Sequence, residues 1–197
     1  MHKGRLEAFS DGVIAIIITI MVLELKVPHG DDFTTLAPML PVFCSYVLSF
    51  VYVGIYWNNH HHLMQSVNKV SGGVLWANLH LLFWLSLVPF GTSWMGENHF
   101  GPRPVALYGV LLLMCGVAYY ILSRVLIRAQ GQHSTLAEAI GRDGKGIASM
   151  VIYAAAIAAS FRLPSFAAIL YVLVAILWLV PDSRIEKRIG ASPGEHH

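Results

Sequence analysis

The sequence predicts an all-α membrane protein with six transmembrane helices in each subunit. Of its 197 residues, 56% are hydrophobic and 12% are charged, whereas about a quarter of the residues of soluble domains are charged. The mean hydropathy is +0.61, and apolar runs long enough to cross a bilayer recur along the chain. Because no long polar stretch leaves room for a soluble domain, residues 1–197 are expected to form one transmembrane domain.

Six segments have the length that a spanning helix requires, about 17–25 mainly apolar residues. They lie near residues 8–27, 38–57, 74–94, 104–123, 146–161 and 165–180. The last two are short and close together, which indicates a helical hairpin. Pro89 lies inside the third segment, where a residue without a backbone N–H should kink the helix. Four other prolines lie at segment starts, where the missing N–H costs little: Pro38, Pro41, Pro104 and Pro164.

The basic residues are distributed unevenly between the two sides of the predicted bundle. With six spans and both ends on one side, that side carries ten Lys and Arg residues, and the other carries three, namely Lys26, Arg103 and Arg162. The positive-inside rule then places both termini in the cytoplasm. We therefore expect a multi-pass protein of the cell (plasma) membrane.

The first segment combines a polar entry with an almost wholly apolar face. At about 100° per residue, Ile20 and Leu23 lie within about 60° of Ile16, as does Thr19, whereas Asp11 points about 140° away. Such a face is typical of a lipid-facing surface, although apolar constrictions also gate pores by dewetting. A carboxylate that enters a bilayer is costly. Asp11 is therefore expected either to stay hydrated at the interface or to join a buried polar network.

A second polar group, Trp57-Asn58-Asn59-His60-His61-His62, lies at the end of the second segment, at the same depth as Asp11. Three consecutive histidines on a helix point about 100° apart, and the spacing of helical zinc sites is absent. We therefore expect no metal site and favour histidines that pair with a carboxylate. A membrane-embedded metal-dependent enzyme or a proton-coupled transporter that uses His60, His61 and His62 is the alternative function.

Three further residues inside apolar runs need an interpretation. Asn78 in the third segment is expected to hydrogen-bond to another helix. Cys44 and Cys115 are expected to be small buried hydrophobic residues rather than a disulfide or a thiolate metal site. Phosphate loops, nucleophile elbows and paired deep carboxylates are missing from the sequence, so an enzyme is not expected.

The start of the chain, Arg5-Leu-Glu-Ala-Phe9-Ser10-Asp11, resembles the RxxxFSD signature that opens helix 1 in the lysosomal potassium channel family of transmembrane protein 175. The run Trp57-Asn58-Asn59-His60-His61 resembles that family's helix 2 pattern, and Val88-Pro89-Phe90 at the end of the third segment also fits. Six spans in a chain of 197 residues match the bacterial members, which carry a single repeat. The resemblance covers essentially the whole chain.

The resemblance implies a channel that selects potassium over sodium, without a P-loop filter, in which helix 1 of each subunit lines the central pore of a homotetramer. The implied hydrophobic constriction is Ile16, Ile20 and Leu23, and Thr19 is implied in selectivity. The expected structural polar network consists of Arg5, Phe9, Ser10, Asp11, Trp57, His60, His61 and Asn78. The resemblance also implies potassium as the permeant ion. Membrane lipid is expected as a further partner, and no cofactor is expected. The net charge of +2 is too small to indicate nucleic acid.

Three acidic residues and one glycine flank this implied pore. Glu24 lies near the outer end of the first segment, and Asp31 and Asp32 follow that segment. All three would concentrate cations at the outer mouth; a solvated loop is the other interpretation of the Asp pair. Gly12, one turn before Ile16, either lets the helix bend or only permits close helix packing.

Overall fold

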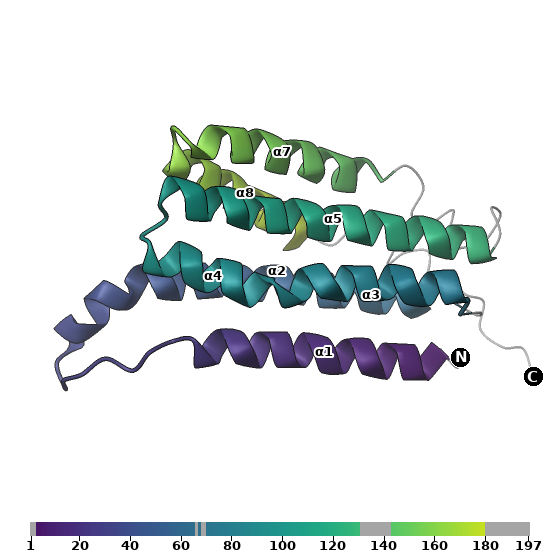
Figure 1. The fold of residues 1–197 in the computed structure, drawn as a ribbon, viewed down its shortest axis with the longest axis horizontal. Helices are drawn as coiled ribbons and strands as arrows, with labels where there is room; N and C mark the ends of the chain where they lie inside the picture. Colours follow the sequence, from purple (N-terminus) through teal and green to yellow (C-terminus); the bar gives the residue numbers. More distant parts are fainter. Residues whose placement is uncertain (1–2, 66, 68–69, 131–142, 180–197) are drawn as a thin grey trace, which may run out of the picture.

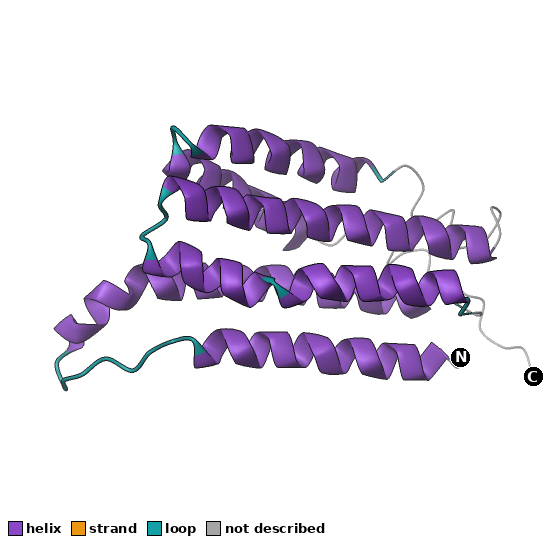
Figure 2. Ribbon diagram, viewed as in Figure 1, coloured by secondary structure: helices purple, strands orange, loops and turns teal. Residues whose placement is uncertain are grey.

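The computed structural model describes residues 3–65, 67, 70–130 and 143–179 (Figure 1). All the regular elements in these ranges are helices (Figure 2). They are α1 (Lys3–Leu23), the 3-10 helix η1 (Phe33–Met39), α2 (Leu40–Gln65), α3 (Gly72–Ser86), α4 (Val88–Glu97), α5 (Pro102–Gln130), α7 (Gly144–Ser160) and α8 (Pro164–Leu179).

These elements make six helical segments that alternate in direction (Figure 1), which confirms the predicted all-helical fold for the described residues. The segments are α1, η1 with α2, α3 with α4, α5, α7 and α8. The first four are long and apolar enough to span a membrane, whereas α7 and α8 are shorter apolar helices of 17 and 16 residues. As predicted, α7 and α8 form a hairpin, in which the Leu163 N–H donates to the carbonyl of Ala159 at 2.8 Å.

The helices of the first two segments begin and end at other residues than the spans predicted near 8–27 and 38–57. α1 begins at Lys3 and ends at Leu23, and its last helical hydrogen bond runs from the Glu24 N–H to the Ile20 carbonyl at 3.2 Å. α2 continues to Gln65, well beyond the predicted end at residue 57. Hydropathy falls at the polar run after Trp57, but Leu63 and Met64 are buried in the core and hold the helix there.

The third segment is interrupted where Pro89 predicts a kink. α3 ends at Ser86, Leu87 separates it from α4, and Pro89 occupies the first turn of α4. Proline has no N–H to donate and its ring clashes with the preceding turn. The helical bonds resume with the Gly91 N–H, which donates to the Leu87 carbonyl at 3.2 Å.

Two hydrophobic cores place α1 at one edge of the bundle. The first core joins α1 with α2, α3, the start of α4 and α5, and the second joins α2, α4, α5, α7 and α8. α5 and α2 contribute to both cores, whereas α1 packs only from one side, against α2, α3 and α4 (Figure 1). The described residues therefore leave the remaining side of α1 uncovered.

The end of the bundle that holds the start of α1 carries most of the basic residues that the structure describes. They are Lys3, Arg5, Arg124, Arg128 and Lys145, and the opposite end carries Lys26, Arg103 and Arg162. The other five basic residues lie outside the described residues. The described basic residues are thus divided between the two ends of the bundle as the six alternating spans predict.

The two cysteines differ in exposure. Cys115 is buried, as predicted, but Cys44 is exposed, so its predicted burial is wrong. The residue that follows it, Ser45, belongs to the buried face of α2, and a helix turns about 100° from one residue to the next. An apolar run alone does not tell which of its residues point to lipid.

The contact between α2 and α4 depends on Gly96. A Cβ on Gly96 would lie 2.5 Å from Ser45 Oγ and 2.7 Å from the backbone Cα of Val42. We expect Gly96→Ala to lower the free energy of unfolding by about 1–3 kcal/mol, because backbone cannot move aside as a side chain can. Thermal unfolding in detergent measures the effect.

Gly54 on α2 is the matched control, because a Cβ there would meet nothing within 4 Å. Gly54→Ala should leave the melting temperature unchanged or raise it, since alanine favours helix by about 1 kcal/mol over glycine. Equal melting temperatures for the two variants would contradict the close approach of α2 and α4.

Candidate functional site

One side of α1 is buried against the rest of the bundle. Leu6, Ser10, Ile14, Ile17 and Met21 recur every three or four residues and are all buried. This spacing puts them on one helix face. Their contacts with the bundle fix the rotation of α1 about its own axis. The residues that point away from the bundle are therefore fixed as well.

The stripe of Ile16, Ile20 and Leu23 lies on the side of α1 that the described residues do not cover. These side chains are 57%, 42% and 80% exposed. Thr19 is also exposed, and its hydroxyl donates to the Ile16 carbonyl at 2.8 Å. A Cβ on Gly12 would meet nothing within 4 Å. The predicted constriction residues therefore share one uncovered surface with Thr19 and Gly12.

A buried chain of three polar side chains connects α1, α3 and α2. The Asn78 Nδ2 donates to Ser10 Oγ at 2.9 Å, and the Asn78 Oδ1 lies 2.8 Å from His60 Nε2. Ser10 and Asn78 are fully buried and His60 is 2% exposed. Ser10 donates in turn to the Leu6 carbonyl at 2.9 Å. Asn78 thus uses both ends of its amide to connect three helices.

Asp11 lies outside this buried chain, in a second and more exposed group. The Trp57 Nε1 donates to Asp11 Oδ1 at 3.1 Å. The His61 ring stacks on Trp57 with centroids 6.2 Å apart, and His61 Nε2 lies 2.9 Å from the Gln65 side-chain nitrogen. The sequence predicted one network for Asp11, Trp57 and His61 together with Ser10, His60 and Asn78, whereas the structure places them in an exposed group and a buried group.

Arg5 and Phe9 do not join either group within the subunit. Phe9 is half exposed, and Arg5 makes no hydrogen bond or ion pair with the described residues. Lys3, which sequence reasoning did not select, donates instead to the Gln65 carbonyl at 3.1 Å and lies 3.9 Å from Glu7. Lys3 and Glu7 are four residues apart on one helix, and this spacing of a cation and a carboxylate is the sequence signal that could have predicted their contact.

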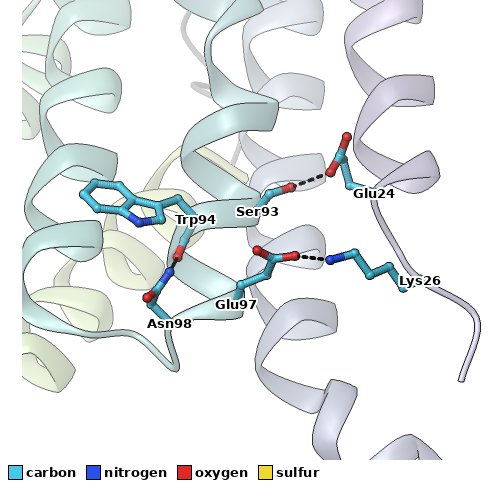
Figure 3. Close-up of polar contacts among 6 residues, drawn as sticks. All are labelled: Glu24, Lys26, Ser93, Trp94, Glu97 and Asn98. Carbon is cyan, nitrogen blue, oxygen red and sulfur yellow. Dashed lines mark hydrogen bonds and ion pairs between the residues drawn. The ribbon is translucent and has the colours of Figure 1, made fainter.

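The chain that leaves α1 is attached to α4 by two polar contacts (Figure 3). Lys26 Nζ lies 2.7 Å from Glu97 Oε1, and Ser93 Oγ lies 3.5 Å from Glu24 Oε2. The hydrogen bond and charge of Glu97 raise the pKa of Lys26 above its usual value. Asp32 caps η1 by accepting from the Thr34 N–H at 3.0 Å. Asp32 thus has a structural role at the start of η1, and Glu24 directly follows the end of α1.

The histidines do not assemble the site that the alternative function requires. His60 points to Asn78 and His61 to Gln65, while His80 Nε2 accepts from Trp84 Nε1 at 2.9 Å. Among the residues that the structure describes, no group of three or more His, Cys, Asp and Glu is placed to hold a metal ion.

Comparison with known proteins identifies several that are similar to this chain. A family model described as endosomal/lysosomal potassium channel TMEM175 matches residues 5–89. A potassium channel of Chryseobacterium sp. (strain P1-3) is 59% identical over 189 residues, which cover 96% of this chain and 98% of the relative. The human endosomal/lysosomal proton channel TMEM175 is 36% identical over 83 residues, or 36% of this chain and 16% of that protein.

A solved structure has the same arrangement of helices. The crystal structure of a lysosomal potassium-selective channel TMEM175 homolog from Chamaesiphon minutus aligns with a TM-score of 0.77 and 26% sequence identity. The alignment covers 90% of this chain and 96% of that one. The match therefore extends over most of both chains.

Proposed function

Because the chain belongs to the TMEM175 family, we propose that four copies of it form a potassium channel in the plasma membrane, with α1 of each copy beside a central pore. The observation that carries the proposal is the 59% identity to a potassium channel over almost the whole length of both proteins. Both termini lie in the cytoplasm in this proposal, which the excess of basic residues at that end supports.

The uncovered face of α1 is the surface that we propose to line the pore. Lipid would accept Ile16 and Ile20, but the same face also carries Gly12 and Thr19. Contacts between helices in membranes are rich in small residues and in Ser and Thr. Contact with neighbouring α1 helices and with an aqueous path suits this mixture of side chains better than lipid does.

Conduction in this proposal depends on an apolar neck. Four Ile16 side chains around an axis would strip part of the hydration shell from a passing ion and offer no ligand in exchange, so a tight neck dewets and closes. Thr19 lies next to the stripe, and its oxygen retains a lone pair while its proton bonds the Ile16 carbonyl. Thr19 therefore offers an acceptor through which potassium and sodium can be distinguished.

Ion flux through liposomes tests the function. Purified protein in liposomes with opposed potassium and sodium gradients should give a membrane potential of the sign set by potassium. Flux no greater than in empty liposomes would reject the proposal. A pH dye in the same liposomes measures proton flux, the activity named for the human relative, and chemical cross-linking counts the subunits.

We expect Asp11→Ala to reduce assembly more than it changes ion preference. The substitution removes the acceptor of the Trp57 Nε1 bond at 3.1 Å, and a bond to a charged group contributes about 1.5–3 kcal/mol. Size-exclusion chromatography measures the assembled fraction. Asp11→Asn keeps an acceptor oxygen and should assemble better than Asp11→Ala. A fully assembled Asp11→Ala channel with altered selectivity would show that Asp11 acts on the ion instead.

A further inference from the structure

The outer end of α1, the end that carries Leu23, is the part of this helix that apolar packing does not hold. Met21 is the last buried residue of α1, and none of residues 22–40 is buried. Leu23, which belongs to the proposed constriction, is 80% exposed. Because buried apolar surface is the main force that holds helices together, the position of α1 beyond Met21 depends on other contacts.

Polar contacts with α4 supply what apolar packing does not (Figure 3). The Lys26 ammonium donates to Glu97 Oε1 at 2.7 Å, which is the length of a charge-assisted hydrogen bond. Ser93 Oγ donates to Glu24 Oε2 at the longer distance of 3.5 Å. These two are the side-chain hydrogen bonds that residues 22–31 make with the described residues. The Lys26–Glu97 pair is therefore the stronger attachment of the outer end of α1.

Glu97 stands on a firmly held part of the bundle. The residue before it, Gly96, lies so close to α2 that a Cβ would be 2.7 Å from the Val42 Cα. Met95 is fully buried in the second hydrophobic core. Since α4 is fixed in this way, the ion pair fixes the outer end of α1 relative to the bundle.

From the unburied end of α1 and its ion pair with a fixed helix, we propose that Lys26 and Glu97 are positioning residues for conduction. α4 lies on the bundle side of α1, so the pair holds Leu23 back from the axis that the uncovered face of α1 approaches. Without the pair, the four Leu23 side chains move together, and a narrower apolar neck dewets more readily. This inference rests on the proposed pore.

A direct effect of the two charges on the ion predicts a different result from a positioning role. Charge near a pore mouth attracts or repels cations, so Lys26→Glu would raise potassium flux by the same factor by which Glu97→Lys lowers it. In a positioning role, each substitution also sets two like charges against one another and releases α1. The pair is exposed, at 81% and 48% of its side chains, and exposed pairs are weak, so this release should lower flux about twofold.

Potassium flux in liposomes separates the two roles through a double-mutant cycle. The fluxes of Lys26→Glu and Glu97→Lys, each relative to the parent, should multiply to about one quarter, and the double variant should conduct like the parent because it restores opposite charges. A product near one, or a double variant no faster than the slower single variant, overturns the proposal.

Arg162→Glu is the matched control for the change in charge. Arg162 is exposed on the turn between α7 and α8, which lies across the bundle from α1 (Figure 1). Its replacement adds the same charge as Lys26→Glu without touching the ion pair, so flux should stay at the parent value. A loss of flux in Arg162→Glu equal to that in Lys26→Glu overturns the positioning role.

Cross-linking at residue 23 measures the position of α1 without requiring conduction. In a Cys44→Ser background, oxidation should join Leu23→Cys side chains of neighbouring copies about twofold faster when Lys26→Glu breaks the pair. Adding Glu97→Lys should return the rate to that of Leu23→Cys alone. Equal rates with and without the pair overturn the positioning role, whereas a parent protein that does not conduct counts against the proposed channel and leaves this measurement decisive for the pair.

Discussion

Replacing Ile16 with asparagine should increase potassium flux and weaken the discrimination between potassium and sodium. The amide would hydrate the neck and offer the ion an oxygen, so the ion loses less of its hydration free energy when it enters the neck. If the barrier to permeation falls by the free energy of one net hydrogen bond, about 1 kcal/mol, the potassium flux should rise roughly fivefold. Flux and reversal potential in the same liposomes measure the two effects.

Ile169 on α8 provides the matched control for Ile16. The two side chains have nearly equal exposure, 55% and 57%, but Ile169 lies far from α1 in the chain and on a helix that we do not place at the pore. Ile169→Asn should leave flux and ion preference unchanged. If Ile16→Asn behaves like Ile169→Asn, Ile16 faces lipid and the constriction lies elsewhere.

Silver block of an Ile16→Cys channel checks the same assignment by accessibility. The experiment requires a Cys44→Ser background, because Cys44 is exposed on α2, whereas Cys115 is buried and protected. Silver ions should stop the current in the Ile16→Cys channel and leave the Cys44→Ser parent conducting. Persistent current in both would place residue 16 outside the ion path.

Replacing Asn78 with alanine should destabilise the subunit more than any other change to its polar network. The substitution leaves His60 Nε2 and Ser10 Oγ without the Asn78 contacts, in the buried region between α1, α2 and α3. Each buried polar group that loses its partner costs about 1–3 kcal/mol. Thermal unfolding measures the loss, and size-exclusion chromatography shows whether α1 still supports assembly.

Asn58 is the control for Asn78, because it is an exposed asparagine on α2 with no hydrogen bond of its side chain to the described residues. Asn58→Ala should unfold at the parent temperature. A double variant, Asn78→Ala with His60→Ala, should cost less than the sum of the single changes, since removing both partners leaves fewer orphaned groups. Additive losses, or an Asn78→Ala protein as stable as Asn58→Ala, would contradict the network.

The sequence by itself determined the class of the protein and much of its organisation. Long apolar runs require a bilayer, so the number and order of the helical segments followed from composition and length. Pro89 predicted the break at Leu87 because proline cannot continue the helical bonding. The three- and four-residue spacing of Ile16, Ile20 and Leu23 placed them on one face, because the period of a helix is a local property.

Only the tertiary structure decided which partner each face has. A helical period gives the direction of a side chain relative to its own helix, but not which helix lies there, so Asn78 rather than Asp11 emerged as the buried link to α1. Hydropathy likewise ended α2 too early, because Leu63 and Met64 are held by contacts with other segments. The Lys26–Glu97 pair joins residues far apart in the chain, and no local pattern predicts such a contact.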